Sequence, residues 1–402
     1  MKSPSSYRGS VWRLLILQAL VNFILWVPIW VVFLQRKGLS LTEIGVLEAL
    51  AWILAAALEV PTGMIADRWG RKASIATGTF LYSLAMFLIL TDALSPTFLL
   101  GYAFWNGSLA FVSGADSALL YDSLKADGHA GEAAKYAGRF GAIQQASQGI
   151  AAFLGSLIAT IDITLCFTIC GVLALVATVL ALTLREPPRL DEAGAKPLTY
   201  LSNLRVAIGI AARRPAVRVL LLLSAVFSVV PLIVYYFLIQ PYALSVGLPL
   251  ASLGLVFVLI QMTSVAASWL AHRVGRRFDL RAIVTVCGGL VVGACVVLGL
   301  VPALPTVALM LVVALVPALL EPLFSARIND LIPSAQRATV LSLSALISEL
   351  GTAALVPLLM GSADLLTPAL AIGLAAGLFA LVTVPLLLMW RAAEPRATPA
   401  LG

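Results

Sequence analysis

Charged residues are scarce in this chain. Of its 402 residues only 11% are charged and 61% are apolar, and the mean hydropathy is +1.02. Soluble domains carry roughly 25% charged and about 45–50% apolar residues. The chain therefore lacks the polar surface that a water-soluble protein of this size needs. This argues against a soluble enzyme, a disordered chain and a disulfide scaffold.

Cysteine and histidine are also rare. The two histidines stand in predicted loops without ligand partners nearby, and no Walker-type Gly-x-x-x-x-Gly-Lys loop occurs. A zinc site takes about four ligands, and ATP hydrolysis by the Walker route needs that loop. We therefore predict neither an enzyme nor a metal or organic cofactor. The four cysteines lie inside apolar runs, where we expect them to pack, at positions Cys166, Cys170, Cys287 and Cys295.

The sequence contains long apolar runs. A helix that crosses a bilayer needs ~20 mostly apolar residues. We predict an all-α membrane protein with twelve transmembrane helices. They cover approximately residues 11–35, 41–66, 73–92, 95–120, 138–160, 162–184, 216–240, 250–271, 281–301, 303–326, 338–361 and 365–390.

The basic residues orient these spans. Lysine and arginine are enriched in cytoplasmic loops. With the N-terminus in the cytoplasm, only Arg36 and Lys37 of the 26 basic residues fall on the outer side. We therefore expect a multi-pass protein of the cytoplasmic (inner) membrane with both termini in the cytoplasm. The net charge of +7 then faces anionic lipid headgroups and not nucleic acid.

One long hydrophilic stretch divides the chain. It is rich in proline and mixed charge. We predict an N-terminal six-helix bundle over residues 1–184, a cytoplasmic linker over 185–215 and a C-terminal six-helix bundle over 216–402. Within the linker, Asn203–Arg214 can form an amphipathic helix on the inner membrane surface. A plain linker fits the same residues.

Two inner loops match each other. Gly63-Met-Ile-Ala-Asp67-Arg68-Trp-Gly70-Arg71-Lys72 follows the second span, and Ser268-Trp-Leu-Ala-His272-Arg273-Val-Gly275-Arg276-Arg277 follows the eighth. A shift of 205 residues relates the loops, and the same shift carries Asp116 onto Glu321. A shared register argues for duplication, and internal repeats are typical of secondary transporters.

The first loop resembles the signature loop of the major facilitator superfamily. Gly63-x-x-x-Asp67-Arg68-x-Gly70-Arg71-Lys72 lies between the second and third spans, on the inner side of a 6+6 chain. The resemblance covers the whole chain. It implies two pseudo-symmetric six-helix bundles that transport by alternating access. The Glu59–Gly63 and Ala118–Leu124 runs resemble a bacterial drug-efflux-like subset of the superfamily.

The resemblance implies that the charged loops latch the inner face. Asp67 can meet the positive N-terminal end of the eleventh span. Arg71 can reach Asp116, and Arg276 can reach Glu321. The alternative is that these charges only fix the topology. The latch candidates are Gly63, Asp67, Arg68, Gly70, Arg71, Lys72, Asp116, Arg276 and Glu321.

Three acids lie well inside predicted spans, away from their ends, where ionisable residues are functional candidates. Glu48 and Glu59 are eleven residues apart, about 20° around a helix, so they share a face. Glu349 lies in the eleventh span. Such a carboxyl can bind a proton when buried and release it to water, which is what proton coupling needs. A neutral structural glutamate is the alternative, and Glu59 is close enough to the inner loop to belong to the latch.

Amides and aromatic rings recur at middle depth. Asn22 and Trp26 follow at a four-residue spacing, as do Gln144 and Gln148, so each pair shares a helix face. A cavity of this kind suits an amphipathic or hydrophobic solute. Interfacial anchoring and helix packing are the alternatives. The cavity candidates are Asn22, Trp26, Asn106, Gln144, Gln148, Tyr235, Tyr236 and Gln261.

Together these features predict a secondary active transporter that exports a hydrophobic or amphipathic small molecule by proton antiport. A proton or sodium gradient is the expected energy source. The fourth span reads Phe104-Trp105-Asn106-Gly107 and lacks the arginine that many drug antiporters of the family carry there, which speaks against this version. Lipid flipping, sugar or metabolite uptake and a membrane receptor are the alternatives. We expect a monomer in the bilayer that binds no nucleic acid.

Overall fold

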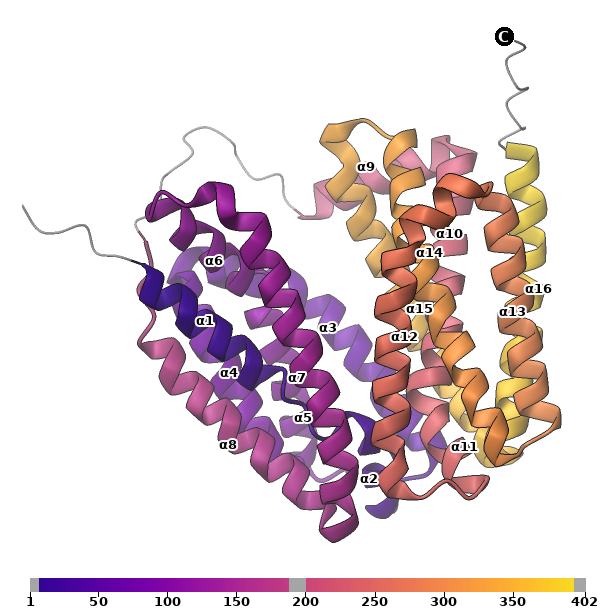
Figure 1. Cartoon of the computed structure of the whole chain (residues 1–402), viewed down its shortest axis with the longest axis horizontal. Coiled ribbons are helices and arrows are strands. Elements are labelled where there is room, and N and C mark those ends of the chain that lie inside the picture. Colours follow the sequence, from indigo (N-terminus) through magenta and orange to yellow (C-terminus); the bar gives the residue numbers. More distant parts are fainter. Residues whose placement is uncertain (1–6, 188–199, 394–402) are drawn as a thin grey trace, which may run out of the picture. The chain divides into compact units, whose positions relative to one another are not determined.

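The computed structural model describes residues 7–187 and 200–393, with side chains throughout except at Arg8, residues 59–69, residues 200–203, Ala335 and Ala338. Every regular element in these ranges is a helix (Figure 1). The prediction of an all-α fold is therefore confirmed.

Eight helices of the described part are long and apolar enough to cross a membrane. Each corresponds to one predicted span. The count of twelve stays a prediction, because the other four predicted spans are interrupted, short or more polar. The eight are Leu41–Leu58, Ile163–Leu182, Pro215–Ser245, Leu250–Arg277, Leu280–Leu300, Leu304–Leu331, Thr339–Leu365 and Pro368–Ala393.

Two of the four remaining spans are broken. The first consists of α1 (Arg8–Val21), a non-helical stretch, the short 3₁₀ turn η1 (Val27–Ile29) and α2 (Trp30–Arg36). The fourth consists of α5 (Pro96–Val112) and α6 (Ala115–Ala126), separated at Gly114, whose φ of +79° favours glycine.

The other two are continuous helices with weaker apolar character. α4 (Arg71–Leu88) has 18 residues, a length of roughly 27 Å at 1.5 Å per residue, and it begins with two basic residues. α7 (Ala133–Ile161) has 29 residues but carries the polar side chains of Gln144, Gln145 and Gln148.

Packing divides the chain into two compact units. Unit 1 holds Met1–Leu39, Ile53–Ala195 and Pro249–Val258, and unit 2 holds Ser40–Trp52, Lys196–Leu248 and Leu259–Gly402. Two long helices, α3 (Leu41–Trp69) and α12 (Leu250–Arg277), therefore change unit along their length. The division differs from the predicted bundles at these two places, because α3 begins against α15 (Arg337–Leu365) and α12 begins against α7.

In unit 1, α4 packs along both α5 and α8 (Ile163–Leu182), as Figure 1 shows. One apolar cluster joins α1, α4, α6 and α8 around Leu14, Ile75 and Leu119, which are completely buried. The 3₁₀ turn η2 (Ala130–Glu132) connects α6 to α7.

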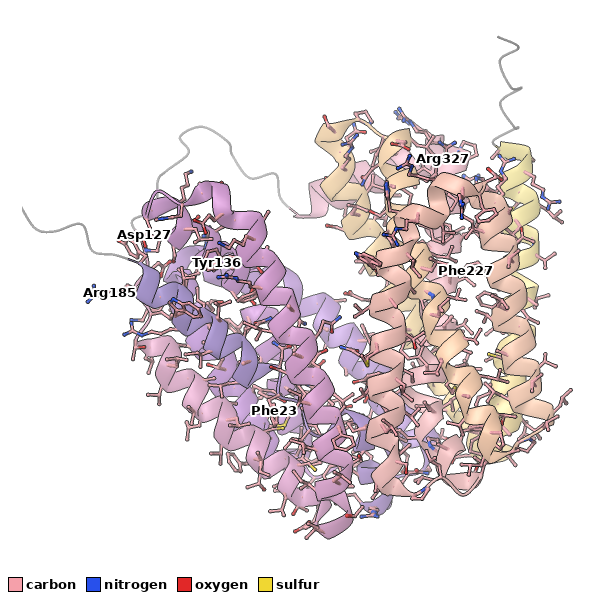
Figure 2. The ribbon with its side chains drawn as sticks, viewed as in Figure 1. Phe23, Asp127, Tyr136, Arg185, Phe227 and Arg327 are labelled. Carbon is pink, nitrogen blue, oxygen red and sulfur yellow. The ribbon has the colours of Figure 1, made fainter. Side chains whose placement is uncertain are left out.

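In unit 2, α13 (Leu280–Leu300) lies beside α16 (Pro368–Ala393), as Figure 1 shows. Phe227, labelled in Figure 2, lies in this unit, and its ring packs on those of Phe324 and Phe379. The predicted helix at Asn203–Arg214 is present as α9 (Tyr200–Arg213); linker residues 188–199 lie outside the described residues. The other elements of this unit are α10 (Pro215–Leu232), the π-helix η3 (Ile233–Leu238), α11 (Ile239–Ser245), η4 (Leu304–Ala308), α14 (Leu309–Leu331), η5 (Ser334–Gln336) and α15 (Arg337–Leu365).

The four cysteines are free thiols buried inside helices. Cys166 and Cys170 lie in unit 1, and Cys287 and Cys295 lie in unit 2. Each is at most 3% exposed, as expected for packing residues.

Candidate functional site

The signature loop turns sharply at Gly70, between α3 and α4. Its φ of +97° lies in the region that favours glycine. The Glu186 carboxylate accepts hydrogen bonds from the backbone N–H groups of Arg71 (2.9 Å) and Lys72 (3.3 Å). An acidic group at a helix N-terminus satisfies unpaired N–H groups and complements the helix dipole. Glu186 therefore ties the chain that follows α8 to the start of α4.

The Arg71 guanidinium joins α4 to α6. It forms an ion pair with Asp122 and donates to the carbonyl of Ala118 at 2.7 Å. The expected pairing with Asp116 is therefore wrong. The chain restarts as a new helix after Gly114, and the Asp116 carboxylate accepts from the N–H of Ser117 at 2.6 Å. Ala118 and Asp122 are one helical turn apart, so both face Arg71.

Other members of the predicted latch are placed less completely. The side chains of Glu59, Gly63, Asp67 and Arg68 lie outside the described residues, and only the helical backbone there is defined. Their assignment stays a prediction. The Lys72 side chain is half-buried at the start of α4.

The second repeat does not form the expected pair. Among the residues whose side chains are described, Arg276 and Glu321 form no ion pair with each other, and both are exposed. Glu321 lies within electrostatic range of the Tyr235 phenol instead. The neighbouring Arg273 stacks over the ring of Trp269, 4.4 Å from its centre. The second loop therefore matches the first in sequence but does not form the corresponding ion pair.

Replacing Gly70 tests the geometry of the turn. In Gly70→Ala the new methyl group would lie 2.7 Å from a Glu186 carboxylate oxygen, at a φ that L-residues rarely adopt. We expect the unfolding free energy to fall by about 1–3 kcal/mol, because the backbone is strained and Glu186 must move away from the new methyl group. Thermal unfolding of the purified protein measures this loss. Gly138→Ala, which meets nothing within 4 Å, is the control. Equal stability of the two variants would contradict the strained turn.

Amide side chains of α1 and α7 meet where the first span breaks. Gln148 donates to Asn22 at 3.1 Å, and Gln18 donates to Gln144 at 3.4 Å. The Asn22 amide also donates to the Gln18 carbonyl, near the end of α1. Irregular backbone at membrane depth is tolerated where it is buried in protein or lines a cavity. Three of the predicted cavity residues are thus brought together, and Gln18 joins them.

Trp26 belongs to a buried ring cluster. It is 3% exposed, and its indole N–H donates to the Tyr82 hydroxyl at 2.9 Å. Its ring lies 4.8 Å from that of Trp105 and 5.4 Å from that of Trp30. Asn106, 7% exposed, donates to the carbonyl of Tyr102 one turn earlier. In this structure Trp26 and Asn106 pack inside unit 1.

Two of the predicted cavity residues of unit 2 lie in a π-helix. Tyr235 and Tyr236 both lie in η3, and π-helical turns are frequent at functional sites. Glu48 is 5% exposed and lies within electrostatic range of Tyr236. A proton-coupling candidate and a cavity candidate therefore lie close enough to interact electrostatically. Gln261 in α12 and Glu349 in α15 are half-buried in the same unit.

Three participants were missed from sequence. Gln18 lies four residues before Asn22, so the stripe of amides could have been extended by one turn. Asp122 lies one turn after Ala118 on the face of α6 that Arg71 meets. No local signal pointed to Glu186, because its partners are more than a hundred residues away.

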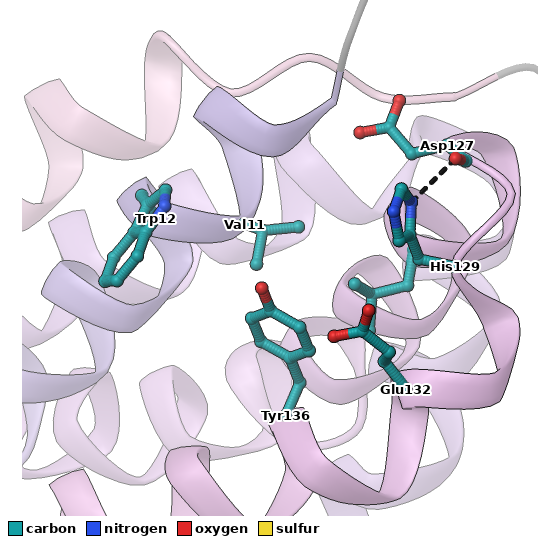
Figure 3. Close-up of a pocket in the computed structure, with 7 residues that line it drawn as sticks. Val11, Trp12, Asp127, His129, Glu132 and Tyr136 are labelled. Atoms are coloured by element: carbon teal, nitrogen blue, oxygen red, sulfur yellow. Dashed lines mark hydrogen bonds between the residues drawn. The ribbon is translucent and has the colours of Figure 1, made fainter.

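A separate small pocket of about 180 Å³ opens at one end of unit 1 (Figure 3). Its His129 ring hydrogen-bonds the Asp127 carbonyl at 2.7 Å. No group of three or more His, Cys, Asp or Glu side chains that could hold a metal ion occurs in the described part. None of the predicted site residues lines this pocket, whose walls are Val11, Trp12, Leu124, Asp127, His129, Glu132 and Tyr136.

Comparison with known proteins places these features in a family. The model of the Major Facilitator Superfamily matches residues 11–355. An uncharacterized MFS-type transporter, YxaM of Bacillus subtilis (strain 168), is 41% identical over 69 residues. That alignment covers 17% of this chain and 16% of the length of YxaM.

Solved transporters share the fold across nearly the whole chain. The nucleoside transporter NupG has a TM-score of 0.76 at 13% identity and covers 95% of this chain and 99% of its own. A bacterial homolog of the human lysosomal transporter Spinster has a TM-score of 0.72 at 18% identity, with both chains fully covered. A D-xylose–proton symporter has a TM-score of 0.69 at 15% identity and covers 95% of this chain and 96% of its own.

At such identities the structural likeness concerns the fold alone. The family model supplies the assignment, since it spans most of the chain and includes the signature loop. The chain belongs to the Major Facilitator Superfamily, a family of membrane transporters and not of enzymes.

Proposed function

We propose that this transporter exports a hydrophobic or amphipathic small molecule by alternating access, in exchange for protons. Its place is the inner membrane, with both termini in the cytoplasm and the signature loop on the inner side. The distribution of basic residues supports this orientation. The direction of transport follows from the weaker resemblance of the Glu59–Gly63 and Ala118–Leu124 runs to efflux carriers.

The buried carboxyl group of Glu48 carries the coupling proposal. It lies in the first part of α3, is 5% exposed, and is within electrostatic range of Tyr236 in the π-helix. A carboxylate in apolar surroundings is costly, so it gains a proton when buried and loses it when water reaches it. A group that changes its access to water during the cycle therefore moves protons. Glu349 is a second candidate in the same unit.

The composition of the predicted spans supports a substrate without a strong negative charge. No lysine or arginine occurs in residues 14–35, 73–120, 140–184 or 219–270. Phosphate and carboxylate groups are usually held by such cations. The amides of Gln18, Asn22, Gln144 and Gln148 offer neutral donors and acceptors in unit 1. This chemistry suits an amphipathic solute.

The loop around Arg71 serves as the latch in this proposal. The ion pair with Asp122 and the Glu186 cap hold α4, α6 and the end of α8 together on the inner side. Both members of the ion pair are about one third exposed (33% and 35%), so a conformational role is better supported than a large gain in stability.

Glu48→Gln tests the coupling. In proteoliposomes with an imposed pH gradient we expect a fall of at least tenfold in proton-driven transport of a labelled amphipathic dye, because the amide cannot titrate. Exchange of dye without a pH gradient should persist. Glu132→Gln, which changes an exposed acid of unit 1, is the control. Undiminished proton-driven transport by Glu48→Gln would remove this residue from coupling.

The same vesicles separate the alternative functions. Dye flux that ignores any ion gradient would argue for a facilitator, and scrambling of a labelled phospholipid would argue for lipid flipping. Uptake of sugars or other metabolites in place of dye would overturn the substrate class. Absence of any flux with a broad set of solutes would favour a receptor.

A further inference from the structure

The first turn of α3 is capped by a residue from the far end of the chain. The Asp364 carboxylate accepts from the N–H of Leu41 at 3.1 Å and from the N–H of Thr42 at 2.6 Å. The Thr42 hydroxyl donates to the same carboxylate at 2.7 Å. The first N–H groups of a helix have no partner within it, and side chains usually supply one. Here α15 supplies it.

A local cap is also present on the same turn. Ser40 and Glu43 exchange hydrogen bonds, since the Ser40 N–H donates to the Glu43 carboxylate at 2.8 Å and the Glu43 N–H donates to the Ser40 hydroxyl at 3.1 Å. Because both residues belong to the start of α3, this reciprocal pair persists when α3 moves relative to α15. The Asp364 contact exists only while α3 and α15 are together.

The dipole of its own helix does not stabilise the Asp364 carboxylate. It lies in the last turn of α15 (Arg337–Leu365), where the helix dipole disfavours negative charge. The N-terminus of α3 is the nearby feature that favours a carboxylate. The position of Asp364 is therefore explained by α3 and not by α15.

The backbones of the two helices meet directly next to this cap. A methyl group on Gly45 would lie 2.8 Å from the Cα of Pro357, and one on Gly361 would lie 3.5 Å from the Thr42 hydroxyl. Small residues allow helices to approach closely in a membrane. Thr42, Gly45, Pro357, Gly361 and Asp364 thus form one contact, which we call the α3–α15 clasp.

The clasp sits on a helix that belongs to both units. Residues 40–52 of the chain pack in unit 2, whereas α3 from Ile53 onward packs in unit 1. Sharp kinks in helices occur at proline, at glycine or serine pairs or at bulges. Between Gly45 and Pro61 α3 has neither glycine nor proline. Because α3 has no residue near position 52 at which a helix readily kinks, we expect its first part to separate from unit 2 when the units move during transport.

We propose that Asp364 is a positioning residue for transport. By capping α3 from α15 it holds the first part of α3 in unit 2, and opening of the clasp is a required step of the cycle. The step breaks three hydrogen bonds, and water replaces them. The local Ser40–Glu43 cap keeps the freed helix end intact.

Labelling of a cysteine inside the clasp reports its opening. Gly361→Cys places a thiol beside Thr42, where a maleimide reaches it only when α3 has moved away, and the four native cysteines are buried. Adding Asp364→Asn should raise the labelling rate about tenfold, since an amide cannot accept all three hydrogen bonds of the carboxylate. Asp364→Glu should restore most of the slow rate.

Asp162→Asn is the matched control for this labelling. Asp162 caps the start of α8 within its own chain segment, accepting from the N–H and hydroxyl of Thr164 at 2.8 Å each. Its loss weakens a helix end without touching the clasp, so the labelling rate should stay within about twofold. Equal rates in the Asp364→Asn and parent backgrounds would overturn the proposal.

A disulfide tests whether the opening is needed. Thr42→Cys with Gly361→Cys brings two thiols close enough to bond. Oxidation should reduce transport by at least tenfold, and reduction should restore it, whereas each single variant should not respond to oxidant. Full transport by the oxidised pair, with the disulfide verified by mass spectrometry, would overturn the proposal. Transport measured in either direction reveals whether the clasp must open. This test therefore does not depend on proton coupling or on efflux.

Discussion

Gly155→Ala is expected to cause the largest loss of stability of any added methyl group in unit 1. The new carbon would lie 1.9 Å from the carbonyl oxygen of Leu25 and 2.7 Å from its carbonyl carbon. Both are backbone atoms in the break of the first span, so no side chain can rotate away. Overpacking of this kind costs about 1–3 kcal/mol, and more where the backbone must shift. Circular dichroism of the purified protein during heating measures the effect.

The matched control lies on the same helix. Gly149 has no atom within 4 Å of an added methyl group. Gly149→Ala should keep or raise the unfolding temperature, because alanine favours a helix over glycine by up to about 1 kcal/mol. If both variants melted alike, the break at residues 22–26 would not lie against α7 as described.

Loss of the ion pair between Arg71 and Asp122 is expected to cause a large loss of transport. In Arg71→Ala the start of α4 loses both the Asp122 carboxylate and the Ala118 carbonyl as partners. We expect transport to fall at least tenfold, with normal insertion in the membrane, because the pair sets the conformation of the latch more than the stability of the fold. Initial rates in proteoliposomes measure the effect.

A double-mutant cycle separates the pair from other effects. Removing Arg71 and Asp122 together should be no worse than removing Arg71 alone, since residues that act as a unit are not additive. The exposed pair of Lys135 and Glu132, 3.3 Å apart, is the control, and its removal should change the rate less than twofold. Losses that simply multiply in the double variant would argue against a shared role.

The fold follows from sequence where apolar runs are continuous. Eight predicted spans reappear as apolar helices because ~20 apolar residues without breaks suffice to specify each one. The first and fourth predicted spans are interrupted by local geometry. Gly114 turns the chain by its positive φ, and Leu25 fits against Gly155 only once the helix has opened. Hydropathy averages over such breaks and does not report them.

The site was less accessible from sequence, because its contacts are long-range. Their positions within the predicted spans put Asn22 and Gln148 at middle depth, and the two side chains form a hydrogen bond. It could not distinguish Asp116 from Asp122 as the partner of Arg71, because the choice depends on where α6 restarts. The caps by Glu186 and Asp364 join residues 115 and 323 positions apart. No local pattern encodes such pairs.

Because buried cysteines occur in both units, the reactivity of the native thiols can be used to measure partial unfolding. Two thiols lie in each unit, and none is more than 3% exposed. A fluorogenic thiol dye would therefore stay dark until one unit opens. Replacing Cys166 and Cys170 by alanine would leave a signal from unit 2 alone, and replacing Cys287 and Cys295 would leave a signal from unit 1. The two halves can then be melted and followed separately in one intact polypeptide.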